Sequence, residues 1–110
     1  MEKRELQQAV DKICKKYDVK TVPVRFTDRH LGGDAYYATY RIRGYKTNYP
    51  RYIMIGNWSM VRAHPGEVAY RLAHEVAHHV LNMKKNSLQH SVAHGRLEDN
   101  IGQAMSRILK

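Results

Sequence analysis

Hydrophobic side chains recur at helical intervals in three segments of the chain, residues 2–17, 65–83 and 94–110. Apolar residues three or four positions apart form one continuous face of a helix, and that face packs on a core. The residues expected on these faces are Leu6, Val10, Ile13 and Tyr17 in the first segment, Val68, Leu72, Val76 and Val80 in the second, and Leu97, Ile101, Met105 and Ile108 in the third. The pattern therefore predicts three amphipathic helices.

Alternating apolar and polar positions between the first two helices predict three strands, at residues 21–27, 35–43 and 52–58. Pro23 favours an edge position for the first strand, since proline cannot donate a ladder hydrogen bond. The sequence Gly32-Gly33-Asp34 predicts a turn, and residues 44–50 predict a polar loop. Together the elements predict a single α+β domain that spans residues 1–110.

The second helix contains the pentapeptide His74-Glu75-Val76-Ala77-His78, which has the form HExxH. Two histidines four positions apart share one face of a helix, so both imidazoles can bind one Zn²⁺. Glu75 lies about 100° from His74 around the helix and can reach a water at the metal. His79 lies about 100° from His78, and we do not expect it to be a ligand. The pattern predicts hydrolysis of amide bonds with Glu75 as the general base.

A catalytic zinc site needs a third protein ligand and an open position for water. The sequence offers three candidates downstream of the pentapeptide, His90, His94 and Glu98. His94 begins the last helical pattern and would face the metal helix, and Glu98 lies one turn further along the same face. The residues alone therefore leave the choice between His94 and Glu98 open.

The pentapeptide, a gap of roughly fifteen residues and His94-Gly95 at the start of a helix resemble the small zincins, namely the SprT-like proteases and the minigluzincins. The resemblance covers nearly the whole chain and implies a minimal zincin-like fold, zinc metallopeptidase activity and a protein or peptide substrate. It implies His74, His78 and His94 as the metal ligands, ahead of Glu98 and then His90.

Two further expectations follow from this resemblance. SprT-like proteins typically have an aromatic residue a few positions after the His-Gly, where this chain has Glu98, and Glu98 would then be a partner of the ligands. Glu98 also lies near the spacing at which thermolysin-like enzymes place a ligand glutamate. Gly102 replaces the acidic residue usual in that second pattern. The strand at residues 51–58, just before the metal helix, would pair with an extended substrate as an edge strand.

The formal net charge is +9, from 19 lysines and arginines against 10 acidic residues. Five basic residues lie among tyrosines and could attract phosphates: Arg41, Arg43, Lys46, Arg51 and Arg62. We favour a solvated basic surface, or attraction to acidic substrates, over a nucleic-acid interface, because no nucleic-acid-binding motif is recognisable. The alternative function is a basic, nucleic-acid-associated domain with a structural zinc and no proteolysis.

Cys14 is the only cysteine, so neither an intramolecular disulfide nor a cysteine zinc ribbon can form. Its place on the first helix predicts a core position. No apolar run is long enough to cross a bilayer and no secretory segment is visible, so we expect a cytoplasmic monomer or small homo-oligomer without a membrane partner. The resemblance to minigluzincins also implies a rival to the active enzyme, a latent zinc protein whose cleft is blocked by its own helix from residue 95 to residue 110 or by a partner.

Overall fold

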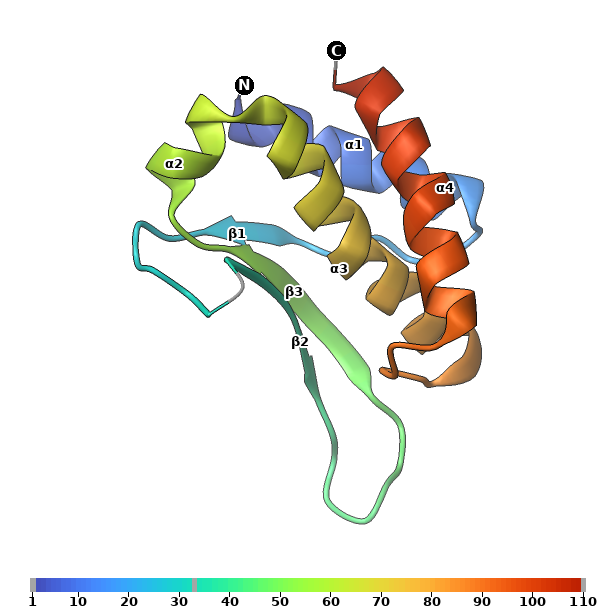
Figure 1. Cartoon of the computed structure of the whole chain (residues 1–110). Coiled ribbons are helices and arrows are strands. Elements are labelled where there is room, and N and C mark those ends of the chain that lie inside the picture. Colours follow the sequence, from blue (N-terminus) through green and yellow to red (C-terminus); the bar gives the residue numbers. More distant parts are fainter. Residues whose placement is uncertain (1, 33, 110) are drawn as a thin grey trace.

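Helices cover one face of a small sheet in the computed structural model, which describes residues 2–32 and 34–109 (Figure 1). In this part of the chain the fold is α+β, with four helices and a three-stranded mixed sheet. The elements in chain order are α1 (Lys3–Lys16), β1 (Val24–Phe26), β2 (Ala35–Tyr40), β3 (Tyr49–Ile55), α2 (Trp58–Ala63), α3 (Pro65–Lys85) and α4 (Val92–Ile108). The three predicted helices are present, and α2 is a further short one.

The strand order in the sheet is β1-β3-β2, with β1 parallel and β2 antiparallel to β3. The edge position predicted for the first strand is confirmed, and Pro23 lies just before it, where its carbonyl accepts a hydrogen bond from the Ile53 amide at 2.9 Å. The prediction that residues 51–58 form a substrate-binding edge is wrong, because β3 is the central strand and is hydrogen-bonded on both sides. The edges are β1 and β2.

The third strand runs from Tyr49 to Ile55 rather than from residue 52 to residue 58, because the chain turns at Gly56 and Asn57. A Cβ at Gly56 would lie 2.6 Å from Cγ of Leu31 and 3.1 Å from the Arg29 carbonyl oxygen, so any other residue there would force the Leu31 side chain to move. Asn57 adopts a left-handed conformation with φ of 50°, and α2 begins at the next residue. Residues 49 and 50 therefore belong to the strand and not to the predicted polar loop.

The other strands are shorter than predicted, since β1 covers only residues 24–26 and β2 ends at residue 40. Within the predicted turn, Gly33 lies outside the described residues. Asp34 has φ of 62°, and its amide donates to the Leu31 carbonyl at 2.9 Å. This turn brings the start of β2 next to the end of β3.

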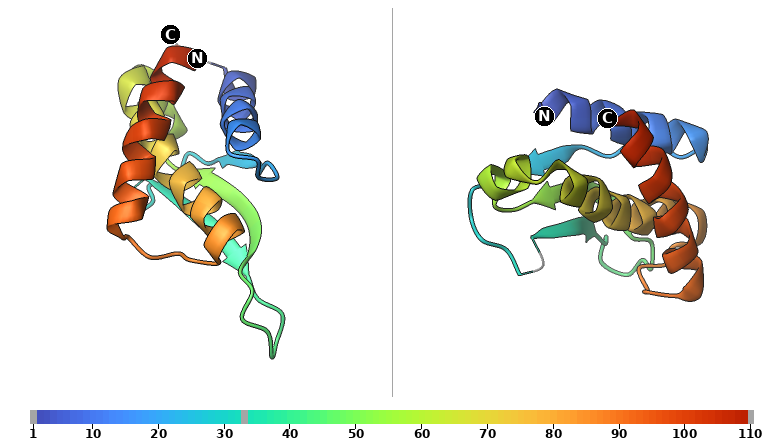
Figure 2. Two further views of the ribbon diagram at one scale, coloured as in Figure 1. Left: turned by 90° about the vertical axis from the view of Figure 1, so that its right-hand side faces the viewer. Right: turned by 45° about the horizontal axis from the view of Figure 1, so that its top comes forward.

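Side chains on the inner face of the sheet point toward the helices. The cross-strand partners Val24, Ile53 and Tyr37 form one row of this face, and Phe26, Ile55 and Ala35 form the next. Tyr37 contacts His79 of α3, and the Lys3 ammonium of α1 lies 5.4 Å from the Phe26 ring centroid. Helices α1 and α3 therefore pack on the same face, and the hairpin between β2 and β3 projects beyond them (Figure 2).

Helix α4 belongs to the core, because Ile101 and Met105 are fully buried against the other helices. They share this core with Leu6 and Val10 of α1 and Leu72 of α3. Removing α4 would expose these apolar side chains, so α4 is an integral part of the fold. Among the described residues, no helix is long and apolar enough to cross a membrane.

Cys14 lies in the core as predicted, with only 1% of its surface exposed. Burial raises the pKa of its thiol to about 11, so the reactive thiolate is scarce at neutral pH. We expect the native protein to react with a thiol reagent such as DTNB at pH 8 at least tenfold more slowly than the protein unfolded in guanidinium. Equal rates in the two states would show that the first helix opens readily.

Candidate metal centre

Helix α3 carries the HExxH pentapeptide and is fixed along most of its length. It begins at Pro65, which suits the first helical position, and has Glu67 in its first turn. It ends at Asn86, which takes the left-handed conformation common at helix C-termini. Val76 and Ala77, inside the pentapeptide, are fully buried, so the core sets the direction in which its histidines point.

The two histidines of the pentapeptide converge with a third one from the loop before α4. Nε2 of His90 lies 3.2 Å from Nε2 of His74 and 3.0 Å from Nε2 of His78. Ligands around a tetrahedral zinc at about 2.0–2.1 Å are separated by roughly 3.3–3.4 Å, so these spacings fit a metal centre. The three atoms belong to one group whose ligand atoms all lie within 4.8 Å of one another.

Glu98 on α4 holds one of these imidazoles in the state that a metal needs. Its Oε1 lies 3.1 Å from Nδ1 of His74, and only 14% of the Glu98 side chain is exposed. The carboxylate accepts a hydrogen bond from Nδ1–H, and in the neutral ring this leaves the lone pair on Nε2 free for a cation. Glu98 therefore contacts a candidate ligand histidine, while its role as a partner of the ligands stays a prediction.

His94 is buried beside this group but makes a different contact. Its Nε2 lies 3.2 Å from the backbone carbonyl of His74, to which it donates, and its own amide donates to Oγ of Ser91. Among the described residues, His94 forms a second candidate group with His74 and Glu98 and does not join His78 in one. His94 as third ligand therefore stays a prediction, while the geometry brings His90, placed last from the sequence, to the pair.

Glu75 lies next to these imidazoles and is 5% exposed. Burial raises the pKa of its carboxyl to about 7, the charge of His74 opposes this shift and the charge of Glu98 adds to it. Burial, together with the neighbouring His94, lowers the pKa of His78 to about 3. His78 is therefore a neutral imidazole at physiological pH, the form that binds a metal.

The site opens into a cleft of about 400 Å³ between β2 and α3. The lining residues are Ala35, Tyr36, Tyr70, Arg71, His74, Glu75, His78 and His90. A smaller hollow of about 170 Å³ adjoins it and is lined by Tyr37, Glu75, His78, Leu88 and His90. The edge strand β2 therefore borders the candidate metal centre, and His74, Glu75 and His78 all face the cleft.

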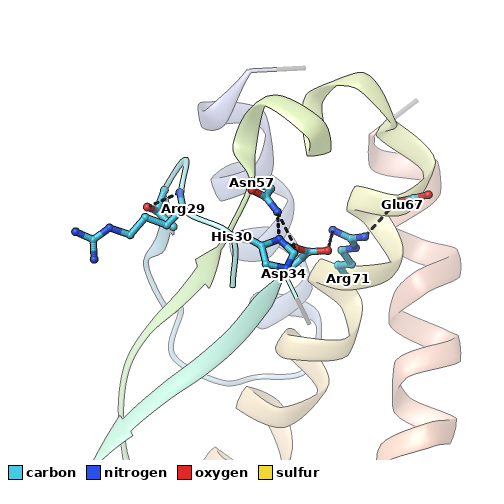
Figure 3. A network of polar contacts seen from close by, with 7 residues as sticks. Arg29, His30, Asp34, Asn57, Glu67 and Arg71 are labelled. Carbon is cyan, nitrogen blue, oxygen red and sulfur yellow. Dashed lines mark hydrogen bonds and ion pairs between the residues drawn. The ribbon is translucent and has the colours of Figure 1, made fainter. Parts of the chain in front are cut away.

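Ion pairs that the sequence analysis did not predict connect the start of β2 to α3 (Figure 3). Arg71, one turn before His74, lies 2.9 Å from a carboxylate oxygen of Asp34 and 3.2 Å from one of Glu67. Nδ2 of Asn57 donates to the same Asp34 at 3.1 Å. The contacts of Asp34 with Arg71 and Asn57 fix one wall of the cleft, and no sequence periodicity could have signalled them because they join distant segments, whereas Glu67 and Arg71 are one helical turn apart on α3.

His79 has its own structural role on the other side of α3. Its Nε2 donates to the Lys20 carbonyl at 2.6 Å, so in the neutral ring Nδ1 accepts from the Tyr37 hydroxyl at 2.8 Å. Nδ2 of Asn82 in turn donates to the Tyr37 oxygen at 3.1 Å. Both ring nitrogens of His79 are thus engaged away from the candidate metal centre, and they help to fix α3 on the sheet.

Comparison of the chain with protein-family models, curated proteins and solved structures found no match. The zincin resemblance therefore rests on the residues of the chain itself.

Proposed function

We propose that this protein is a zinc-dependent peptide hydrolase. The observation that carries the proposal is the convergence of three imidazoles, with Nε2 of His90 lying 3.2 Å from Nε2 of His74 and 3.0 Å from Nε2 of His78, beside a buried glutamate in an open cleft. His74 and His78 hold the zinc together with His90, and His94 is the competing third ligand that the sequence pattern implies. Glu98 orients His74.

Zinc, when bound in such a site, supplies Lewis acidity that activates a water and polarises a carbonyl. Glu75 accepts the proton of the attacking water on its carboxylate and then delivers it to the leaving amine, so one group serves as base and acid in turn. Its burial excludes bulk water from the carboxylate during this transfer. Neutral His78 and the Glu98-bound tautomer of His74 leave lone pairs for the metal.

The substrate backbone binds along β2 in this proposal. β2 is an edge strand, and Ala35 and Tyr36 at its start line the cleft. An edge strand presents unpaired amides and carbonyls that an extended peptide can pair with. The ion pair between Arg71 and Asp34 keeps this edge next to the HExxH helix. β2 therefore takes the role that the sequence analysis gave to the strand now known to be central.

The rival function is a zinc domain without hydrolysis, in which the metal is structural. Structural zinc sites are closed by four protein ligands. Among the described residues, the group of His74, His78 and His90 contains no fourth ligand atom within 4.8 Å. Three protein ligands at an open cleft favour a catalytic zinc site over a structural one.

Removing the metal tests the proposal. We expect zinc-reconstituted protein to contain about one zinc per chain by elemental analysis and to cleave unfolded casein or a quenched-fluorescence peptide library. 1,10-Phenanthroline should abolish cleavage, and added zinc should restore it. Zinc at a hundred times its dissociation constant should stabilise the fold by about 2.7 kcal/mol, seen as a higher Tm.

Two results would count against this function in different ways. Reconstituted protein without zinc would rule out the metal centre itself. Stoichiometric zinc without cleavage of any tested substrate would instead favour the rival non-hydrolytic domain.

A further inference from the structure

The outer face of the sheet, opposite the helices, carries a row of aromatic side chains. Cross-strand pairing places Tyr36 beside Met54 and then Arg25, Tyr52 beside Ala38, and Tyr40 beside Tyr49. The rings of Tyr40 and Tyr49 are stacked at 5.3 Å, and those of Tyr36 and Tyr52 meet edge to face at 6.1 Å. Four of the eight tyrosines thus lie on this tyrosine face, formed by residues 36, 40, 49 and 52.

Two of these rings are exposed, those of Tyr49 and Tyr52 are half-buried, and cations lie beside the Tyr52 ring. Tyr36 and Tyr40 are 40% and 49% exposed. The guanidinium of Arg25 lies 4.7 Å from the Tyr52 ring centroid and that of Arg51 lies 5.5 Å from it. The ladder skips Arg51, since Tyr52 pairs with Ala38 and Pro50 with Thr39, so this basic residue stands at a bulge.

Basic residues surround the tyrosine face, and the stretch of sequence that forms it contains no acidic residue to balance them. Between Asp34 and Glu67 the sequence contains five basic residues and no acidic one. Four of the five, all exposed, lie on β3 or the projecting hairpin: Arg41, Arg43, Lys46 and Arg51. The nearest carboxylate before this segment, Asp34, is already paired with Arg71. A polyanion would therefore meet complementary charge along the face.

We propose that the tyrosine face and the adjoining hairpin bind single-stranded nucleic acid. Unpaired bases can stack on exposed aromatic rings and guanidinium planes, while lysines and arginines contact the phosphates. A duplex keeps its bases stacked inside and cannot use the rings in this way, and the carboxylates of an acidic protein would meet the positive charges but not stack on the rings. Tyr36 also lines the cleft, whereas Tyr40, Tyr49 and Tyr52 do not, so this binding does not depend on hydrolysis there.

Fluorescence anisotropy with labelled (dT)15, measured from 50 to 200 mM KCl, tests the proposal. Tyr40→Leu should weaken binding by about tenfold or more, since stacking is worth about 1–3 kcal/mol per base. Tyr40→Phe, which keeps the ring, should bind like the wild type. Arg43→Gln combined with Lys46→Gln should lower the slope of log K against log[KCl] by about 1.4, the value for two phosphate contacts on a single strand.

Lys12→Gln combined with Lys15→Gln removes the same charge from the exposed side of α1 and should leave both affinity and slope unchanged. Glu75→Gln should also bind (dT)15 normally. Three results would each overturn the proposal. They are absence of (dT)15 binding at 50 mM KCl, equal weakening by the two double charge variants, and displacement of the labelled strand by polyglutamate as effectively as by unlabelled (dT)15. Equal affinity for a 15-base-pair duplex would overturn it too. If Tyr40→Leu does not fold, as judged by circular dichroism, Arg43→Gln combined with Lys46→Gln still tests the proposal.

Discussion

Glu75→Gln is expected to lower kcat/KM for peptide hydrolysis by about 10² to 10⁴, the range that a positioned general base contributes. Glutamine has nearly the same shape as glutamate but cannot accept the proton of the attacking water. The side chain is 5% exposed, and a neutral amide carries no charge to desolvate, so the fold should tolerate the change. Elemental analysis should still find about one zinc per chain, because Glu75 is a base in this mechanism and not a ligand.

Glu5→Gln is the matched control, since Glu5 is exposed on α1 and the substitution removes the same charge. It should leave both zinc content and rate unchanged. Wild-type activity in Glu75→Gln would remove Glu75 from the role of base. Loss of zinc in that variant would instead show that the carboxylate helps to hold the metal.

The helical part of the fold could be predicted from the sequence because each helix repeats its apolar positions over many turns. The first predicted helix is one residue longer at each end than α1, and the HExxH helix begins at Pro65 as expected. Local patterns of this kind are largely independent of the rest of the chain. They fixed which face of α3 carries His74 and His78.

Strand order could not be predicted in the same way, since it depends on contacts between distant segments. The chain order gave no sign that β3 would lie between β1 and β2. The end of β3 depends on Gly56 meeting Leu31, a contact across more than twenty positions. For this reason the substrate edge was placed on the wrong strand.

The position of His90, the proposed third ligand, depends on the path of the loop between Lys85 and Val92, which has no hydrophobic periodicity from which a structure could be predicted. In the structure this loop places His90 against His74 and His78. The last helix was predicted to begin at His94 and begins two residues earlier, at Val92, because Ser91 is the N-cap and its hydroxyl accepts a hydrogen bond from the His94 amide at 3.2 Å. The approximate start of a helix does not determine where a side chain in its first turn points.

Substitution of His90 and His94 should separate the two candidate ligand sets by zinc affinity, measured in competition with a chromophoric chelator. We expect His90→Ala to lower the affinity by more than 100-fold, because it removes a nitrogen that lies within 3.2 Å of both other histidines. Glu98→Gln should lower it by about 10–100-fold, as is typical when the partner of a ligand histidine is lost. His94→Ala should retain one zinc per chain but lower the Tm, since His94 is 2% exposed and its loss leaves a cavity.

His64→Ala is the control for removing a histidine, because His64 is exposed at the start of α3 and should affect neither zinc affinity nor stability by much. The opposite pattern, with zinc lost in His94→Ala and kept in His90→Ala, would contradict the assignment of His90. The ring of His94 would then have to leave the His74 carbonyl and turn toward the metal, as the small-zincin resemblance implies. Its centroid is only 4.1 Å from that of His78, so this rearrangement would require rotation of the side chain rather than movement of α4. The comparison therefore tests the position of one imidazole within a fold that both ligand sets share.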